Sequence, residues 1–267
     1  MPELPEVETI ANGVNERVRG ARITRVWTSG KPQTFKSPEQ EIADTLTGAT
    51  IAAVRRVGKT VVMDVTRKKI AAQFLIHLGM TGRLLVSQPE VALPAHTHAI
   101  LSLADGREIR FVDPRRFGRL SVTSGYTGPG AEPTTISAEA FAQLFKGRKL
   151  AIKAALLNQS ILHGVGNIYA DESLFRAGIR PRRQAGRLTR AELDRLHQAL
   201  QDVLARAIHL GGSSVSDYVD AEGRRGYFQI EHKVYGHAGE DCSDCGTALK
   251  KLVVGGRTTV YCPNCQK

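Results

Sequence analysis

CSDCGTALKKLVVGGRTTVYCPNC, residues 242–265, contains all four cysteines of the chain. Two Cys-x2-Cys pairs are separated by sixteen residues, a spacing typical of a structural zinc site with four thiolate ligands. Gly246 and Pro263 supply turn residues beside the pairs. The sequence therefore predicts a C-terminal hairpin that holds one structural zinc ion, with two disulfides as the disfavoured alternative in an untargeted chain. The predicted ligands are Cys242, Cys245, Cys262 and Cys265.

Upstream of the cysteines, the apolar residues recur at helical spacing. Thr189 and Glu192 form a capping-box pattern at the start of one expected helix, and a glycine pair stops that helix. Residues 150–180 predict two further helices, separated by the turn HGVGN at 163–167. Glycines let such a turn approach a phosphate, and the N-terminus of the next helix presents free N–H groups.

Between residues 21 and 122, short β-branched runs alternate with turn signals, which is typical of a β-sandwich or a flattened barrel. Asp105-Gly106 lies between two runs and is a strong hairpin signal. Residues 124–135 are rich in Gly, Pro, Ser and Thr and indicate a linker. The expected strands contain ITRVW, TIAAV, TVVMDV, IAAQFLI, AILSL and EIRFV.

The first eight residues, MPELPEVE, place a proline beside a carboxylate. Removal of Met1 would expose the secondary amine of Pro2, and an α-amino group is partly uncharged, and so nucleophilic, near neutral pH. Attack on a sugar C1′ would give a cationic iminium, while Glu3 could shuttle protons. An apolar pattern over residues 5–18 predicts a helix that fixes Pro2 in place. The simpler interpretation is that Pro2 only permits removal of methionine.

The charge of the chain favours a polyanionic partner. Among its 267 residues, 37 Lys+Arg against 26 Asp+Glu give a net charge of +11. Nucleic acid is the commonest such partner, although an acidic membrane surface remains possible on charge alone. No apolar run approaches the ~18–20 residues of a membrane span, and the N-terminus lacks a signal-peptide core. We therefore expect a cytoplasmic, nucleoid-associated protein with no membrane contact.

Several motifs resemble those of the formamidopyrimidine-DNA glycosylase family, in the family's order. They are the N-terminal octet, RRVGKT at 55–60, HLGMTG at 77–82, DPRRFG at 113–118, GVGNIYADESLFRAGIRP at 164–181 and the hairpin tip VGGRT at 254–258. The resemblance covers essentially the whole chain and implies a multidomain α+β fold. It assigns residues 2–123 to a catalytic β-sandwich with one helix, 124–135 to a linker, 136–232 to a helical helix-two-turn-helix domain and 233–267 to a zinc β-hairpin.

The resemblance implies a bifunctional DNA glycosylase and AP lyase that removes 8-oxoguanine and formamidopyrimidines from double-stranded DNA as a monomer. Pro2 would attack C1′ and Glu3 would protonate the opening sugar, with Glu6 as support. Lys59 would bind a phosphate beside the lesion. Zinc would be the only cofactor.

The same resemblance implies which residues hold the distorted duplex. Met80 and Phe117 would fill the gap left by the extruded nucleotide, and Arg115 would donate to the orphaned base. The implied phosphate ligands are Arg116, Asn167 and Arg257.

The chain departs from many relatives at two positions. Thr60 follows Lys59 where an aromatic residue is usual, and Ser216 stands in the lesion-capping loop where a lysine or arginine is common. Two alternatives stay open: an endonuclease VIII-like glycosylase for oxidised pyrimidines, and a non-catalytic protein that binds damaged DNA. Leu4 disfavours the first, because that branch typically has glycine there.

Overall fold

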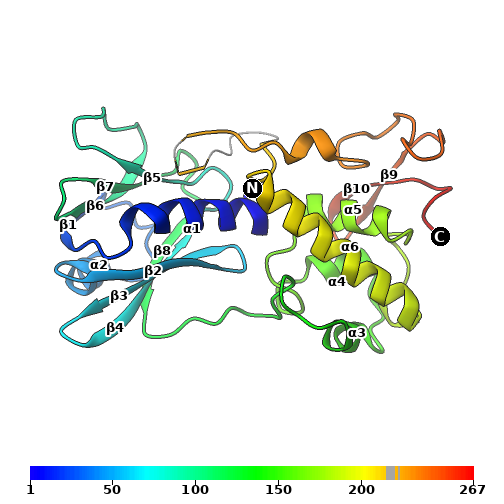
Figure 1. Ribbon diagram of the computed structural model, residues 1–267, viewed down its shortest axis with the longest axis horizontal. Helices are drawn as coiled ribbons and strands as arrows, with labels where there is room; N and C mark the ends of the chain where they lie inside the picture. The colour runs from blue at the N-terminus through cyan, green and yellow to red at the C-terminus, as the bar shows by residue number, and fades with distance from the viewer. Residues whose placement is uncertain (215–219, 222) are drawn as a thin grey trace. The chain divides into compact units, whose positions relative to one another are not determined.

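The computed structural model describes residues 1–214, 220–221 and 223–267, which form two compact units (Figure 1). The N-terminal unit comprises Met1–Thr127 and Leu210–Tyr227, and the C-terminal unit comprises Gly128–His209 and Phe228–Lys267. The sequence boundaries grouped the segment after residue 209 with the helical domain, whereas here residues up to 227 belong to the first unit. None of the helices in the described part of the chain combines the length and apolar character needed to cross a bilayer.

The N-terminal unit is a sandwich of two four-stranded antiparallel sheets, ordered β1-β6-β7-β5 and β2-β3-β4-β8. Apolar side chains from both sheets and from helix α1 form one continuous core, which confirms the expected β-sandwich. The expected hairpin at Asp105-Gly106 joins β6 to β7. The strands are β1 (Ile23–Thr28), β2 (Thr50–Val57), β3 (Thr60–Arg67), β4 (Ile70–His77), β5 (Arg83–Ser87), β6 (Thr97–Leu103), β7 (Glu108–Val112) and β8 (Arg119–Thr123).

Helix α1 (Leu4–Val18) contacts β2 and β3 of one sheet and β5 of the other. Val7, Ile10 and Val14 recur on one face, and all three side chains are buried in the core. Burial of such a side chain is worth roughly 1.5–3 kcal/mol. The helix is therefore held firmly, and the residues just before it inherit a defined position.

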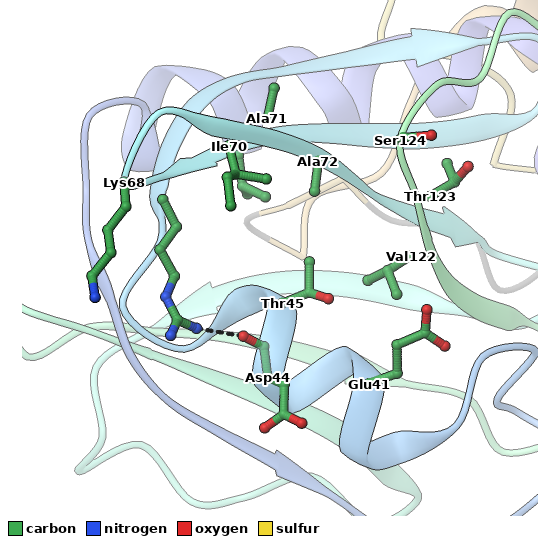
Figure 2. A pocket seen from close by; sticks show the side chains of 12 residues that line it. Glu41, Asp44, Thr45, Lys68, Ile70, Ala71, Ala72, Val122, Thr123 and Ser124 are labelled. Atoms are coloured by element: carbon green, nitrogen blue, oxygen red, sulfur yellow. Dashed lines mark hydrogen bonds between the residues drawn. The ribbon is translucent and has the colours of Figure 1, made fainter.

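A second helix, α2 (Glu39–Leu46), was not expected, and neither were strands β5 and β8. The helix buries only Ile42 and Leu46, too few positions to give a clear helical period. Residues of α2, β3, β4 and β8 line a hollow of about 690 Å³ (Figure 2). None of the residues that the sequence assigns to a site is among the twelve that line it.

The C-terminal unit begins with helices whose ends follow the sequence signals. The hydroxyl of Ser137 accepts a hydrogen bond from the Ala140 N–H at 3.2 Å. Thr189 and Glu192 form the predicted capping box, with the Thr189 N–H donating to Glu192 Oε2 at 2.8 Å and the Glu192 N–H to Thr189 Oγ1 at 3.3 Å. The elements are α3 (Ala138–Phe145), α4 (Ile152–Leu157), α5 (Asn167–Arg176), η1 (Ala185–Arg187), α6 (Arg190–His209) and η2 (Phe228–Glu231).

Strands β9 (Lys250–Val254) and β10 (Arg257–Tyr261) form the C-terminal hairpin. Its two-residue turn is Gly255-Gly256, with φ of 57° and 71°. This left-handed pair gives the hairpin its tight turn, for which glycine is favoured. A side chain at Gly255 would also lie only 3.3 Å from Ala154 Cβ of α4. The turn is thus packed closely on the helical part of the unit.

Candidate functional site

The carboxylate of Glu6 connects the N-terminus to the segment that follows α6. Its Oε2 accepts a hydrogen bond from the Glu3 N–H at 2.8 Å, and its Oε1 accepts one from the Ser213 N–H at 2.7 Å. Glu3 and Glu6 are only 5% and 2% exposed, and Pro2 is also buried. A carboxylate that accepts two backbone N–H groups is rigidly placed. The geometry therefore fixes the backbone of the first residues, where the sequence places its nucleophile and proton carrier.

Two glycines make this junction sterically possible. Gly212 has φ +83°, and a Cβ there would lie 2.8 Å from Glu6 Oε1. A Cβ at Gly226 would lie 2.2 Å from the Gly212 carbonyl oxygen, and the Gly226 N–H donates to the Ser214 hydroxyl at 2.8 Å. The backbone at Gly212 and Ser214 is thus closely packed against the backbone at Gly226. Ser216, the residue expected in the lesion loop, lies outside the described residues.

Lys59 lies in the turn between β2 and β3. Arg56 braces this turn, because it pairs with Glu8 of α1 at 2.6 Å and donates to the Gly58 carbonyl at 3.3 Å. Burial, followed by the positive charges of Lys59 and Arg119, lowers the pKa of His77. The imidazole of His77 is therefore uncharged at neutral pH and adds no further repulsion to Lys59 and Arg119.

The loops that carry Met80 and Phe117 pack against each other. Gly79 has φ +63°, and a Cβ there would lie 2.5 Å from the Phe117 carbonyl carbon. Met80 and Phe117 are 39% and 46% exposed, so two large apolar side chains project from these neighbouring loops. The guanidinium carbon of Arg115 lies 4.8 Å from the centre of the Phe117 ring. The structure thus brings these three sequence-predicted residues together, and Arg116 is the residue of this loop with a left-handed φ of 57°.

Asp113 fastens both loops, a role that the sequence analysis missed. The carboxylate is fully buried and accepts from the Thr81 hydroxyl at 2.6 Å and from the Gly118 N–H at 2.7 Å. Its Oδ1 also accepts from the Arg115 N–H at 3.3 Å. The sequence signal that could have indicated this role is the aspartate that begins the motif DPRRFG. One buried carboxylate thus ties the loop that carries Met80 to the loop that carries Arg115 and Phe117.

The turn before α5 is held by Gln159. Its Oε1 accepts from the Gly164 N–H at 2.9 Å, and its amide nitrogen donates to the Leu157 and Val165 carbonyls, each at 2.9 Å. Asn167 follows as the first residue of α5 and donates to the Thr258 carbonyl of β10 at 3.0 Å. The expected phosphate ligand therefore lies beside the hairpin that carries Arg257.

Lys153 and Asp171 form an ion pair of 2.6 Å, and both side chains are completely buried. Lys153 Nζ also donates to Thr259 Oγ1 at 2.7 Å and to the Thr258 carbonyl at 3.1 Å, while Asp171 accepts from the Val260 N–H at 3.2 Å. Burial raises the pKa of Asp171 to about 6, against the opposing effect of Lys153. The pair joins α4, α5 and β10. A lysine within the apolar run AIKAALL was the only sequence signal.

Lys153→Met should lower the free energy of unfolding of the C-terminal unit by about 3–5 kcal/mol, because it leaves a buried carboxylate without its counter-charge. The loss should be larger at pH 8 than at pH 5, since removal of the ammonium raises the pKa of Asp171 further and protonation then removes the uncompensated charge. Hydrogen exchange at the Val260 N–H measures the effect. The double variant Lys153→Met/Asp171→Leu should recover most of it; a single variant within about 1 kcal/mol of wild type would contradict this account.

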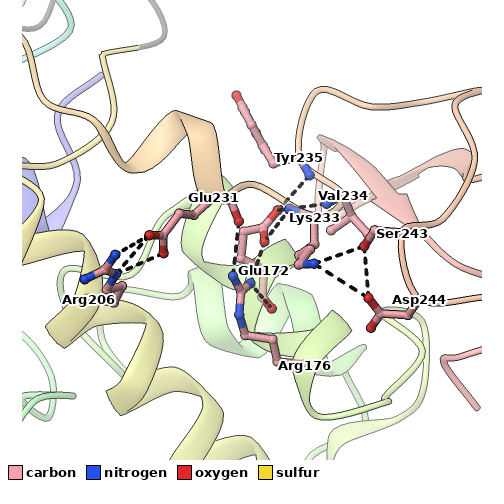
Figure 3. A network of polar contacts seen from close by, with 9 residues as sticks. All are labelled: Glu172, Arg176, Arg206, Glu231, Lys233, Val234, Tyr235, Ser243 and Asp244. Atoms are coloured by element: carbon pink, nitrogen blue, oxygen red, sulfur yellow. Dashed lines mark hydrogen bonds and ion pairs between the residues drawn. The ribbon is translucent and has the colours of Figure 1, made fainter.

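The carboxylate of Glu172 anchors the chain that leads into the zinc hairpin (Figure 3). It is fully buried and accepts from three successive backbone N–H groups, those of Lys233 at 2.9 Å, Val234 at 3.0 Å and Tyr235 at 2.9 Å. It also pairs with Arg176 at 2.5 Å. Two adjacent acids of α5 therefore hold two parts of the zinc-finger segment, residues 233–267. Glu172 binds residues 233–235 at its start, and Asp171 binds its second strand, β10.

The four cysteines gather as the zinc prediction requires. All four Sγ atoms lie within 4.8 Å of one another, with Cys242 and Cys265 at 4.0 Å and Cys245 and Cys262 at 3.5 Å. A tetrahedral zinc with Zn–S bonds of ~2.3 Å places its sulfurs ~3.8 Å apart, so the thiolates fit the ion. The cysteines are free, and the disulfide alternative is therefore wrong. Four thiolates leave no position for a catalytic water, so the zinc is structural.

A β-sandwich with a fixed, carboxylate-bearing N-terminus, a helix-two-turn-helix element and a zinc hairpin define a DNA-repair glycosylase. Residues 1–120 match the formamidopyrimidine-DNA glycosylase N-terminal domain, residues 127–219 its H2TH domain, and residues 239–267 the zinc finger found in FPG and IleRS. The chain therefore belongs to the formamidopyrimidine-DNA glycosylase family, whose members are bifunctional DNA glycosylases and AP lyases.

Full-length relatives agree with these matches. The formamidopyrimidine-DNA glycosylase of Xanthomonas euvesicatoria is 42% identical over 275 residues, with both chains covered completely. A mutant of the Lactococcus lactis Fpg, solved in complex with DNA that contains Fapy-dG, has a TM-score of 0.90 at 32% identity, again with 100% of both chains covered. The MutM (Fpg) protein of Thermus thermophilus has a TM-score of 0.87 at 38% identity and covers 99% of this chain and 98% of its own.

Proposed function

We propose that this enzyme excises 8-oxoguanine and formamidopyrimidines from double-stranded DNA and then cleaves the abasic strand by β,δ-elimination. The observation that carries the proposal is the burial of Pro2 and Glu3, where Glu6 fixes the backbone of Glu3 next to Pro2. Family membership supports the substrate class, since the Lactococcus lactis relative was solved with Fapy-dG DNA and with abasic-site DNA.

In the proposed reaction, removal of Met1 frees the Pro2 nitrogen, which bonds to C1′ as the C1′–base bond breaks and its electron pair leaves with the base. The Pro2 nitrogen loses its proton in this step, and the departing base takes up a proton, so that both groups leave the step neutral. Glu3 donates a proton to the ring oxygen as the sugar opens, so that the cationic iminium forms. The iminium acidifies C2′; loss of a C2′ proton expels the 3′ phosphate, and a second elimination expels the 5′ phosphate. Hydrolysis of the remaining iminium regenerates the amine. No catalytic metal takes part in these steps.

The remaining residues hold the duplex in this proposal. Met80 and Phe117 fill the gap in the stack, and Arg115 donates to the unpaired base. Their exposure on interlocked loops supports this role. Lys59, Arg116, Asn167 and Arg257 bind phosphates, and the bond from Asn167 to the strand of Arg257 supports a shared phosphate surface in the C-terminal unit. The enzyme would act as a monomer, because one chain supplies every group.

Borohydride should trap the wild-type protein covalently on a duplex that contains 8-oxoguanine or an abasic site, because reduction makes the iminium permanent. Peptide mapping should place the adduct on Pro2. Pro2→Gly, which offers a primary amine in a looser backbone, should trap far less.

An adduct on a lysine, or undiminished trapping by Pro2→Gly, would overturn the assignment. Parallel reactions on a duplex with an oxidised pyrimidine test the endonuclease VIII-like alternative, which predicts faster trapping on that lesion than on 8-oxoguanine.

A further inference from the structure

Five exposed cations lie on the C-terminal unit outside the residues assigned above. We call them the basic ridge: Lys146, Arg148, Lys149, Arg182 and Arg187. The local sequence concentrates positive charge there, because no acidic residue occurs between Glu139 and Asp171 or between Glu172 and Glu192. Charge of one sign over such lengths produces a field that attracts a polyanion.

The backbone brings the two halves of the ridge together. The Gly186 N–H donates to the Arg148 carbonyl at 2.9 Å, the Ala185 N–H to the Leu150 carbonyl at 2.9 Å, and the Ile152 N–H to the Arg183 carbonyl at 2.7 Å. A Cβ at Gly186 would lie 2.8 Å from the Arg148 nitrogen, so this close approach favours glycine. Segments 35 residues apart in sequence therefore present their cations on one surface.

The ridge cations differ from neighbouring arginines in that they have no carboxylate partner among the described residues. Within the described part of the chain, none of the five pairs with a carboxylate, whereas Arg183 is paired with Glu192 at 3.0 Å and Arg190 with Asp194 at 2.8 Å. Cations already paired gain less from a phosphate, because they must first give up their own carboxylate. The five ridge side chains carry no such cost.

One ridge residue reaches the zinc hairpin. Arg182 donates to the Val253 carbonyl at 3.4 Å, and Val253 is paired with Thr258, the residue after Arg257. Ala154 packs against the turn at Gly255. It lies two residues after Ile152, whose N–H donates to the Arg183 carbonyl. The ridge therefore continues the surface on which the proposed function places the phosphate ligands Asn167 and Arg257.

We propose that the basic ridge is a second phosphate-binding surface, which contacts duplex backbone beyond the nucleotides around the lesion. This inference rests on the proposed function for its choice of polyanion. Lysine and arginine without base contacts bind undamaged and damaged duplex alike, so the ridge serves the search along DNA as well as the final complex. Each phosphate contact releases counterions and steepens the salt dependence of binding.

The test compares three double variants that remove the same charge. Arg148→Gln/Lys149→Gln and Arg182→Gln/Arg187→Gln alter the ridge, while Arg190→Gln/Arg206→Gln alters exposed arginines of α6 that are paired with acids. Affinity for an undamaged duplex of about 30 base pairs is measured between roughly 50 and 200 mM salt. Each ridge variant should lower the slope of log K against log salt by one to two units, at about 0.9 per phosphate contact, and the α6 variant by under about half a unit.

The proposed role of the basic ridge would be overturned if both ridge variants kept the wild-type slope of log K against log salt. It would also be overturned if the α6 variant lowered that slope as much as the ridge variants do. Borohydride trapping of the wild type on lesion DNA is run beside these titrations. Failure to trap would count against the proposed glycosylase chemistry, and the titrations would still decide whether the ridge binds duplex DNA.

Discussion

Glu3→Gln should slow base release by about 10²–10⁴-fold, because a positioned proton donor typically contributes that much to the rate. Glutamine keeps the length of the side chain and one oxygen acceptor, and the Glu3 backbone N–H that donates to Glu6 is untouched. Binding of lesion DNA should therefore be retained. Single-turnover excision of formamidopyrimidine, with binding measured in parallel, gives both quantities.

Glu16→Gln is the matched control, since Glu16 is an exposed acid on α1, the helix for which Glu3 is the N-cap residue. It should leave both excision and binding as in the wild type. If Glu3→Gln released the base at the wild-type rate, Glu3 would not be the proton donor. If it lost DNA binding instead, the carboxylate would act in holding the duplex and the proposed chemistry would need another acid.

Removal of zinc should unfold the C-terminal hairpin and abolish tight DNA binding. Apparent zinc-binding free energies of about 10–16 kcal/mol in finger peptides become local folding energy when the metal-free site has no structure of its own. Cys262 is fully buried and Cys242 is nearly so. The packing of the hairpin around these two side chains therefore depends on the zinc site. Chelation, or Cys245→Ser, should abolish exchange protection in β9 and β10 while protection in the β-sandwich persists.

Ser243→Ala provides the control within the same cysteine turn, because it removes a hydroxyl and leaves all four thiolates. It should retain one zinc per chain and full DNA affinity. A zinc-free protein that bound lesion DNA as tightly as the wild type would contradict the role of the hairpin in binding.

The features predictable from sequence were those with a local or a repeated signal. The capping box at Thr189 and Glu192, the helix predicted over residues 5–18 and the zinc cluster each depend on fixed spacings, and the structure confirms all three. The runs that became β1, β2, β3, β4, β6 and β7 were recognised because β-branched residues dominate them. The short strands β5 and β8 and helix α2 carry few buried residues, and their pattern is correspondingly weak.

The contacts that hold the site in place could not be predicted, even for Glu6, which the resemblance names as a supporting residue, because the partners are remote in sequence. Glu6 meets Ser213 across 207 positions, and Lys153 meets Thr259 across 106. Asp113 is the first residue of the motif DPRRFG, yet the pattern did not reveal that its carboxylate would bind two loops at once. Roles of this kind depend on which distant backbone groups reach a buried acid.

The adjacent residues Asp171 and Glu172 limit the transfer of the zinc finger to another protein as an independent domain. Between them they receive four backbone N–H groups from residues 233–235 and 260. A finger transplanted into another protein would lose these acceptors, and the helix left behind would keep two buried carboxylates with fewer donors. Recombination that exchanged the zinc-finger segment would thus succeed only if the acidic dipeptide of α5 travelled with it. The finger and this helix form one heritable unit, although residues 177–232 lie between them in the chain.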